Sequence, residues 1–124
     1  MGAFGIWLRL SNSNTLSGNT ISTLNGTSGA VGIRIYDGMF NTISGNIINN
    51  LISDTITWGF DLPGFSDHNT IIGNTASFFQ ATSKLFIYLR ADADYNTVVG
   101  NTGSGCGGID DFGIGNLIAN NVVS

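Results

Sequence analysis

The sequence predicts an all-β solenoid, in which short strands from successive coils pair in parallel, and three observations support this prediction. A hexamer related to Asn-Thr-Ile-Ser-Gly-Asn recurs, starting at Asn14, Asn41, Asn69, Asn96 and Asn116. A second motif, related to Gly-Ile-x-Leu, recurs in step with it. Within the motifs apolar and polar residues alternate, as in a strand with one buried face.

The shared period of the two motifs indicates a stacked repeat. Successive hexamers start 27, 28, 27 and 20 residues apart. The second motif lies at residues 5–10, 32–38, 59–64, 86–92 and 108–113. Units that bury one face against their neighbours form solenoids, and no window has the apolar spacing and caps of a helix. We therefore expect one domain over residues 1–124, with about four to five coils of 20–28 residues.

Three strands are expected in each coil. The first is the Gly-Ile-x-Leu segment, and the second is the hexamer with the two residues after it. The third lies in the variable residues 22–30, 49–58 and 77–84. Parallel strands lie about 4.8 Å apart, so residues at equivalent positions should stack along the axis of the solenoid.

This stacking explains why the asparagines recur. One ladder is expected from Asn14, Asn41, Asn69, Asn96 and Asn116, and another from Asn19, Asn46, Asn74, Asn101 and Asn121. Stacked amides can bond along the axis and to the turn backbone. The asparagines, with the glycines at 18, 45, 73 and 100, should supply the left-handed backbone of the corners. Between them Leu16, Ile43, Ile71, Val98 and Ile118 should form an inward aliphatic stack.

The coupled motifs resemble the repeats of the pectate-lyase-like superfamily, and most closely its NosD-type carbohydrate-binding and sugar-hydrolase repeats. The resemblance covers Gly5 to about Val123. It implies a right-handed parallel β-helix and an extracellular location or a place on a cell or virion surface. Because this fold hosts enzymes, tail spikes, adhesins and noncatalytic modules, it implies no single function. The coils here are longer than the compact turn of the family, and its capping helix is missing.

Composition limits the partners and cofactors. The net charge is −4 with four basic residues, so there is no basic stripe for nucleic acid. No segment approaches the roughly 18 apolar residues of a membrane span, and the first residues lack the features of a signal peptide. His68, Cys106 and Met39 have no metal-ligand spacing, and no cofactor is expected.

The outward positions of the Gly-Ile-x-Leu strands form a candidate carbohydrate-binding face. Aromatic rings pack against the apolar side of a pyranose, while arginine and aspartate bond its hydroxyls. The favoured, purely structural explanation is that tyrosine, tryptophan and arginine are common at outward strand positions. The candidate residues are Trp7, Arg9, Arg34, Tyr36, Asp61, Tyr88, Arg90, Asp110 and Phe112.

No catalytic residue is predicted. Asp61 and Asp110 stand two coils apart, roughly 10 Å, which is a spacing used in glycoside hydrolysis, but Tyr88 lies between them. Asp67 and Asp94 occupy equivalent positions and are weak candidates for a Ca²⁺ site. Capping of their own turns is the favoured interpretation.

A threonine ladder offers a further hypothesis. It consists of Thr15, Thr42, Thr70 and Thr97. A flat threonine face allows ice or crystal binding, but Ile72 and Val99 interrupt the adjacent row that begins with Ser17 and Ser44. An ordinary solvated β-surface is favoured.

The preferred prediction is a noncatalytic module for structural display, with carbohydrate binding on the outer face. Apolar cross-sections and unpaired strand edges are expected at both ends, and such surfaces recruit another chain. The first alternative is therefore a self-stacking subunit of an extracellular or viral fibre. The second is a fragment of a polysaccharide lyase, hydrolase or epimerase whose acid and base lie in missing coils.

Overall fold

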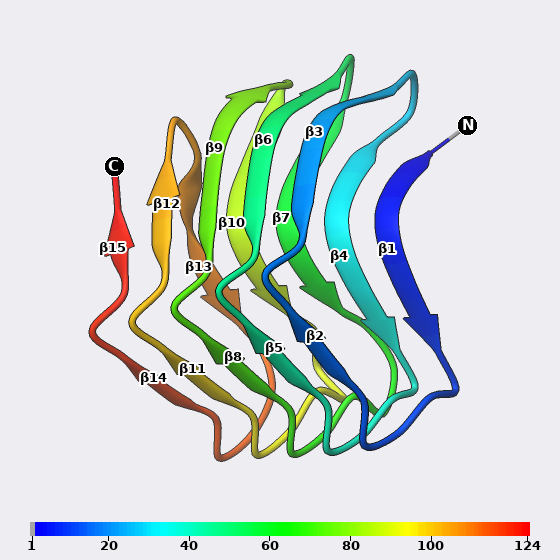
Figure 1. Ribbon diagram of the computed structural model, residues 1–124, viewed down its shortest axis with the longest axis vertical. Coiled ribbons are helices and arrows are strands. Elements are labelled where there is room, and N and C mark those ends of the chain that lie inside the picture. Colours follow the sequence, from blue (N-terminus) through cyan, green and yellow to red (C-terminus); the bar gives the residue numbers. More distant parts are fainter. Residues whose placement is uncertain (1) are drawn as a thin grey trace.

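The computed structural model describes residues 2–124, which form three parallel sheets around a common interior (Figure 1). Sheet A consists of β1 (Ala3–Arg9), β4 (Ala30–Tyr36), β7 (Ile56–Leu62), β10 (Ser83–Leu89) and β13 (Gly107–Asp111). Sheet B consists of β2 (Thr15–Ser17), β5 (Thr42–Ser44), β8 (Thr70–Ile72), β11 (Thr97–Val99) and β14 (Leu117–Ala119). Sheet C consists of β3 (Thr20–Gly26), β6 (Ile47–Ser53), β9 (Thr75–Gln80), β12 (Thr102–Ser104) and β15 (Val122–Val123). This part of the chain contains no helix that is long and apolar enough to cross a membrane.

The predicted parallel β-solenoid is confirmed, since the chain visits sheets A, B and C in turn and each strand pairs with its equivalent in the next coil. Leu16 lies opposite Ile43, and Ile43 lies opposite Ile71. Ile43, Ile71 and Val98 are fully buried, as expected for the inward stack. Ile118 is 38% exposed because β14 has a neighbour on one side only.

The asparagine ladders are also confirmed. The Nδ2 and the backbone N–H of Asn41 both donate to Oδ1 of Asn69, over 3.0 and 2.9 Å. Asn46 bonds to Asn74 in the same two ways. The amide of Asn74 also donates to the carbonyl oxygen of Ile43 in the preceding coil, over 2.9 Å. Each buried amide thereby bonds to groups in both neighbouring coils.

The boundaries of the second and third strands differ from the prediction. Thr20 and Ile21, which follow the first hexamer, belong to sheet C and not to sheet B. The chain turns before them, at Gly18, whose φ is 65°. The later part of the predicted third strand, from Ala30 in the second coil, already belongs to sheet A. The corner between sheets B and C consists of only two residues, such as Gly18 and Asn19. Strand propensity does not reveal so short an interruption.

The left-handed residues are only partly those predicted. The glycines at 18, 45, 73 and 100 have φ between 61° and 66°, as expected. The prediction that the ladder asparagines share this conformation is wrong. The residue before the first asparagine adopts it instead, with φ between 55° and 69° at Ser13, Phe40, His68, Tyr95 and Gly115. This turn leaves the asparagine side chain directed along the axis, where its Oδ1 meets the neighbouring coil.

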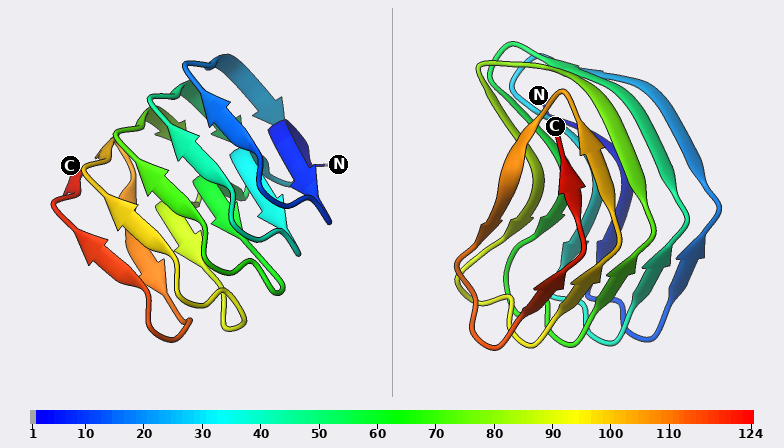
Figure 2. Two further views of the ribbon diagram at one scale, coloured as in Figure 1. Left: turned by 60° about the horizontal axis from the view of Figure 1, so that its bottom comes forward. Right: turned by 90° about the vertical axis from the view of Figure 1, so that its left-hand side faces the viewer.

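The coils differ in length on the side of sheet C. Strands β3 and β6 have seven residues, whereas β12 has three and β15 has two. The strands of sheet B keep three residues from β2 to β14. Phe86 fills the interior beside Gly103, where an added Cβ would lie 2.6 Å from the ring. The last coil is therefore narrower than the earlier ones (Figure 2, right).

Candidate functional site

The outer face of sheet A is shaped by a glycine within its strands. Residues three apart in a regular strand point to opposite faces, yet the rings of Phe4 and Trp7 stack with centroids 5.1 Å apart. The reason is that Gly5 and Ile6 both face the interior. A Cβ on Gly5 would lie 2.8 Å from the side chain of Ile21, and Ile6 packs against the buried core. A larger residue at Gly5 would clash with its neighbours.

The same pair of inward positions recurs along the sheet. An added Cβ on Gly32 would lie 2.7 Å from the side chain of Ile48, and one on Gly59 would lie 3.3 Å from Ala76. The neighbouring residues Ile33 and Phe60 are buried as well. Figure 2 shows the resulting bend of sheet A toward the interior. Side chains on the two sides of this bend therefore converge on the outer face.

The predicted register of the outer face agrees with the structure. Trp7 lies opposite Arg34, Arg34 opposite Asp61, and Asp61 opposite Tyr88. Tyr88 lies opposite Asp110 in the last coil. The next outward row begins with Arg9 opposite Tyr36. The candidate residues thus form one continuous surface.

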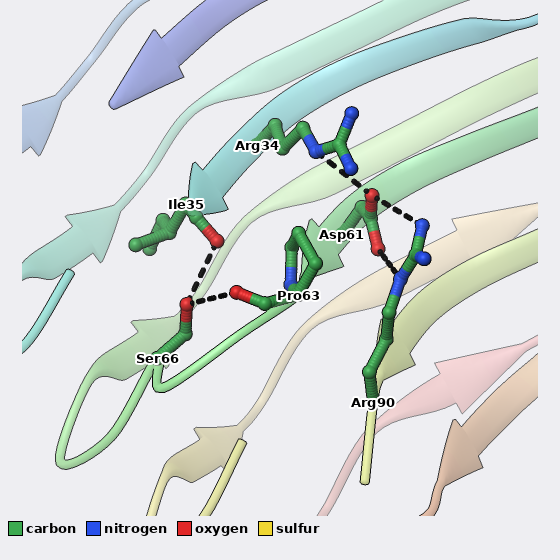
Figure 3. A network of polar contacts seen from close by, with 6 residues as sticks. All are labelled: Arg34, Ile35, Asp61, Pro63, Ser66 and Arg90. Atoms are coloured by element: carbon green, nitrogen blue, oxygen red, sulfur yellow. Dashed lines mark hydrogen bonds and ion pairs between the residues drawn. The ribbon is translucent and has the colours of Figure 1, made fainter. Parts of the chain in front are cut away.

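A buried ion cluster stands at the centre of this face (Figure 3). Asp61 has no exposed surface. Arg90 donates to its two oxygens from Nε and Nη2, over 3.0 and 3.1 Å, and Nε of Arg34 lies 3.2 Å from Oδ2. The two arginine side chains keep 19% and 36% of their surface exposed. A ligand on this face would therefore meet the arginines and not the carboxylate.

Opposing effects act on the carboxyl group. Burial raises the pKa of Asp61 above its ordinary value of 3.8, while the bond from Arg90 and the charges of Arg90 and Arg34 lower it, and burial has the larger effect. The pair of guanidinium groups is what favours the ionised form. Asp61 in turn fixes the positions of both arginine head groups.

Aromatic rings hold the arginines from the sides. The guanidinium carbon of Arg34 lies 5.3 Å from the centroid of Phe4 and 5.7 Å from that of Tyr36. That of Arg90 lies 5.2 Å from Trp58 and 5.1 Å from Tyr88. These distances are those of cation–π contacts.

The remaining arginine is held only by rings. The guanidinium carbon of Arg9 lies 6.0 Å from Trp7 and 6.0 Å from Tyr36. Unlike Arg34 and Arg90, Arg9 makes no ion pair within residues 2–124. Its donors are therefore available to a ligand.

Two nitrogen atoms on this face lack a conventional partner. Nε1 of Trp58 is buried without a hydrogen bond among the described residues. Nε of Arg34 is close to Asp61 but outside hydrogen-bonding geometry. Buried donors are usually paired in folded proteins. Two unpaired buried donors on the outer face of sheet A are therefore unusual.

Sequence reasoning missed two members of this face, Phe4 and Trp58. In a flat strand Phe4 would point away from Trp7, and Trp58 away from Asp61, because the residues of each pair are three positions apart. The available signal was the glycine in the middle of each strand, at Gly5 and Gly59, since glycine within a strand often marks a bend.

Three of the carboxylates considered for chemistry, those of Asp61, Asp67 and Asp94, make structural contacts. Asp61 is buried while Asp110 is exposed, and Tyr88 lies between them in the sheet register. Oδ1 of Asp67 accepts the backbone N–H of Asp94 over 2.9 Å. Oδ1 of Asp94 accepts that of Ile114 over 2.7 Å. Residues 2–124 contain no cluster of three metal-ligating side chains.

Charge is distributed unevenly over the solenoid. Of the four basic residues, Arg9, Arg34 and Arg90 gather on the outer face of sheet A. The strands of sheets B and C contain no charged residue. Three of the four basic residues of the chain thus lie on one face, together with Asp61 and Asp110.

No family model, curated protein or solved structure matches this chain. The fold assignment consequently rests on the strand order, the register and the asparagine ladders.

Proposed function

We propose that this solenoid is a noncatalytic display module that binds carbohydrate on the outer face of sheet A. The observation that carries the proposal is the set of arginine heads held between aromatic rings around Asp61. Because these side chains are already ordered, binding costs little conformational entropy.

The face offers the two kinds of contact that a sugar needs. Trp7 is 46% exposed, so part of its ring is free to pack against the apolar side of a pyranose. Arg9 supplies donors that make no ion pair within residues 2–124. Hydroxyl groups of a sugar are suitable acceptors for these donors.

The resemblance of the repeats to NosD-type members of the pectate-lyase-like superfamily supports the same proposal. It also keeps the enzyme alternative open, in which further coils carry the acid and base. Assay of pooled glycans for reducing-end or unsaturated-uronate products tests that alternative, and persistent absence of products would count against it.

Replacement of Trp7 or Tyr36 by alanine should weaken retention on a polysaccharide array roughly tenfold, since buried aromatic contacts contribute most at interfaces. The matched control is Ile72→Ala, which removes a 42% exposed side chain from sheet B. Its retention should equal that of the parent. Failure of the parent chain to bind any polysaccharide, or unchanged retention of both sheet A variants, would reject the proposal.

A second candidate function is axial self-association, and the direction of the ladder bonds favours it. The backbone N–H of each ladder asparagine donates to Oδ1 of its equivalent in the next coil, as Asn96 does to Asn116 and Asn101 does to Asn121. A second copy placed after the last coil would present Oδ1 of its Asn14 and Asn19 to the backbone N–H groups of Asn116 and Asn121. Stacking of this kind is heterologous and produces fibres.

The 124-residue chain should therefore form larger species with rising concentration in sedimentation velocity. Ile118→Lys should suppress them, because it places a charge in the apolar end of the last coil, where Ile118 is 38% exposed. Ile72→Lys, on the outer side of sheet B, is the control and should leave assembly unchanged. A monomer at all concentrations would contradict this function.

A further inference from the structure

A column of stacked rings lies along the turns between sheets A and B. Phe40 stacks on His68 with centroids 5.1 Å apart, and His68 stacks on Tyr95 at 5.4 Å. These residues occupy the same position in three successive coils, directly before a ladder asparagine. We call Phe40, His68, Tyr95 and the adjacent Ile114 the aromatic edge.

The turn itself does not require these rings. All three aromatic residues have a left-handed backbone, with φ of 58°, 56° and 55°. Glycine adopts this conformation without a steric penalty, and Gly115 occupies the equivalent position in the last coil. The backbone at Phe40, His68 and Tyr95 is therefore held in a conformation that is unfavourable for bulky residues. Glycine at these positions would not carry this penalty.

The aromatic edge is largely open to solvent. Phe40 is 58% exposed, Tyr95 56% and Ile114 68%. By contrast, the corners between sheets B and C consist of glycine or asparagine followed by a ladder asparagine. A continuous apolar strip of this kind is a feature of interaction surfaces.

Carboxylates flank the strip. Asp67 precedes His68 and Asp94 precedes Tyr95, and each uses Oδ1 for a backbone bond within the solenoid. Asp37 and Asp92 lie in the same set of turns. The one basic residue there, Arg90, is bound to Asp61. The rim of the aromatic edge is therefore anionic.

This rim identifies the kind of partner. A second copy docked edge to edge would bring like charges together, and an anionic membrane surface would be repelled for the same reason. An apolar segment flanked by lysine or arginine complements both the rings and the carboxylates. We propose that the aromatic edge is a docking site for a protein segment of this amphipathic, basic kind.

The chain itself supplies variants that test the proposal without disturbing the turns. Phe40→Gly with Tyr95→Gly places glycine where the last coil already has Gly115. Asp67→Asn with Asp94→Asn removes two charges and keeps the Oδ1 acceptors, as Asn12 does when its Oδ1 accepts the backbone N–H of Met39. Circular dichroism should show an unchanged fold for both double variants.

Calorimetric titration with a synthetic peptide of alternating leucine and lysine is the test. The parent should bind it, whereas the counterpart with glutamate in place of lysine should not bind. The glycine variant should bind about tenfold more weakly. The Asp67→Asn, Asp94→Asn variant should bind about three- to tenfold more weakly, as expected for loss of exposed ion pairs.

Asp54→Asn is the control for general attraction to an acidic protein, since Asp54 lies in a turn between sheets C and A. It should not change the affinity. The proposal would be overturned if Asp54→Asn weakened binding as much as the Asp67→Asn, Asp94→Asn variant does. It would also be overturned by equal binding of both peptides or by unchanged affinity of the two double variants. Dimerisation of the parent that is lost in the glycine variant would also overturn it, because the edge would then belong to a second copy.

Discussion

Replacement of Asn74 by alanine should lower the free energy of unfolding by about 3–5 kcal/mol, because several buried groups lose their partners together. Oδ1 of Asn74 accepts both the backbone N–H and the side-chain amide of Asn46. Its Nδ2 donates to Ile43 and to Asn101. Asn74 and Asn46 are at most 1% exposed, so water does not replace these bonds. Each orphaned buried group costs about 1–3 kcal/mol.

Urea denaturation measures this effect, and Asn14→Ala in the first coil is the control. Asn14 is only part-buried, and without its amide Oδ1 of Asn41 still accepts the backbone N–H of residue 14. The control should therefore lose only about 1 kcal/mol. Equal losses in the two variants would show that the ladder is not the source of the difference.

Asp61→Ala should lower the free energy of unfolding by about 3 kcal/mol, since it leaves two guanidinium groups close together without a counter-charge. Arg34 and Arg90 approach Asp61 within 3.2 and 3.0 Å. Their partial exposure places the expected loss at the lower end of the range for buried ion pairs. The variant should also bind carbohydrate more weakly, because the arginine heads are no longer held in place.

A triple variant separates charge from packing. Asp61→Leu combined with Arg34→Met and Arg90→Met removes all three charges, and apolar replacement of a complete cluster is often neutral or stabilising. Its unfolding free energy should return close to that of the parent. A triple variant as unstable as Asp61→Ala would mean that the packing of Asp61, and not the unpaired charges, matters.

The pH dependence of the parent supplies a second readout of the same group. Because burial raises the pKa of Asp61, the native state binds this proton more tightly than the unfolded chain. The contribution of Asp61 to stability therefore falls as pH rises from about 3.8 through the native pKa. The triple variant lacks the group and should lack this part of the slope.

The fold was predictable because two independent motifs share one period. The shared period also predicts the register of the strands, and therefore the contacts of Asn41 with Asn69 and of Leu16 with Ile43. The left-handed glycines at 18, 45, 73 and 100 were predictable. The left-handed residue before the first asparagine of each hexamer was not, since preference for that conformation points to asparagine, whereas the turn places it at bulky residues such as Phe40.

The candidate site was predictable only in part. Alignment of the repeats placed Arg34 and Asp61 side by side, which the pairing of β4 and β7 confirms. Burial of Asp61 was not predictable, because an outward position in a flat sheet is normally exposed. The inward bend at Gly59 brings Trp58 and the arginines over the carboxylate. The burial of Asp61 therefore depends on the three-dimensional course of the strand rather than on the identity of residue 61.

The shortening of the last coil on the side of sheet C has a consequence for how such a molecule changes in size. The amide ladders continue unchanged from Asn96 to Asn116 although that coil spans 20 residues and not 27. The length of the rod and its thickness are therefore set independently: the number of coils fixes how long the rod is, and residues gained or lost around a coil fix how thick it is.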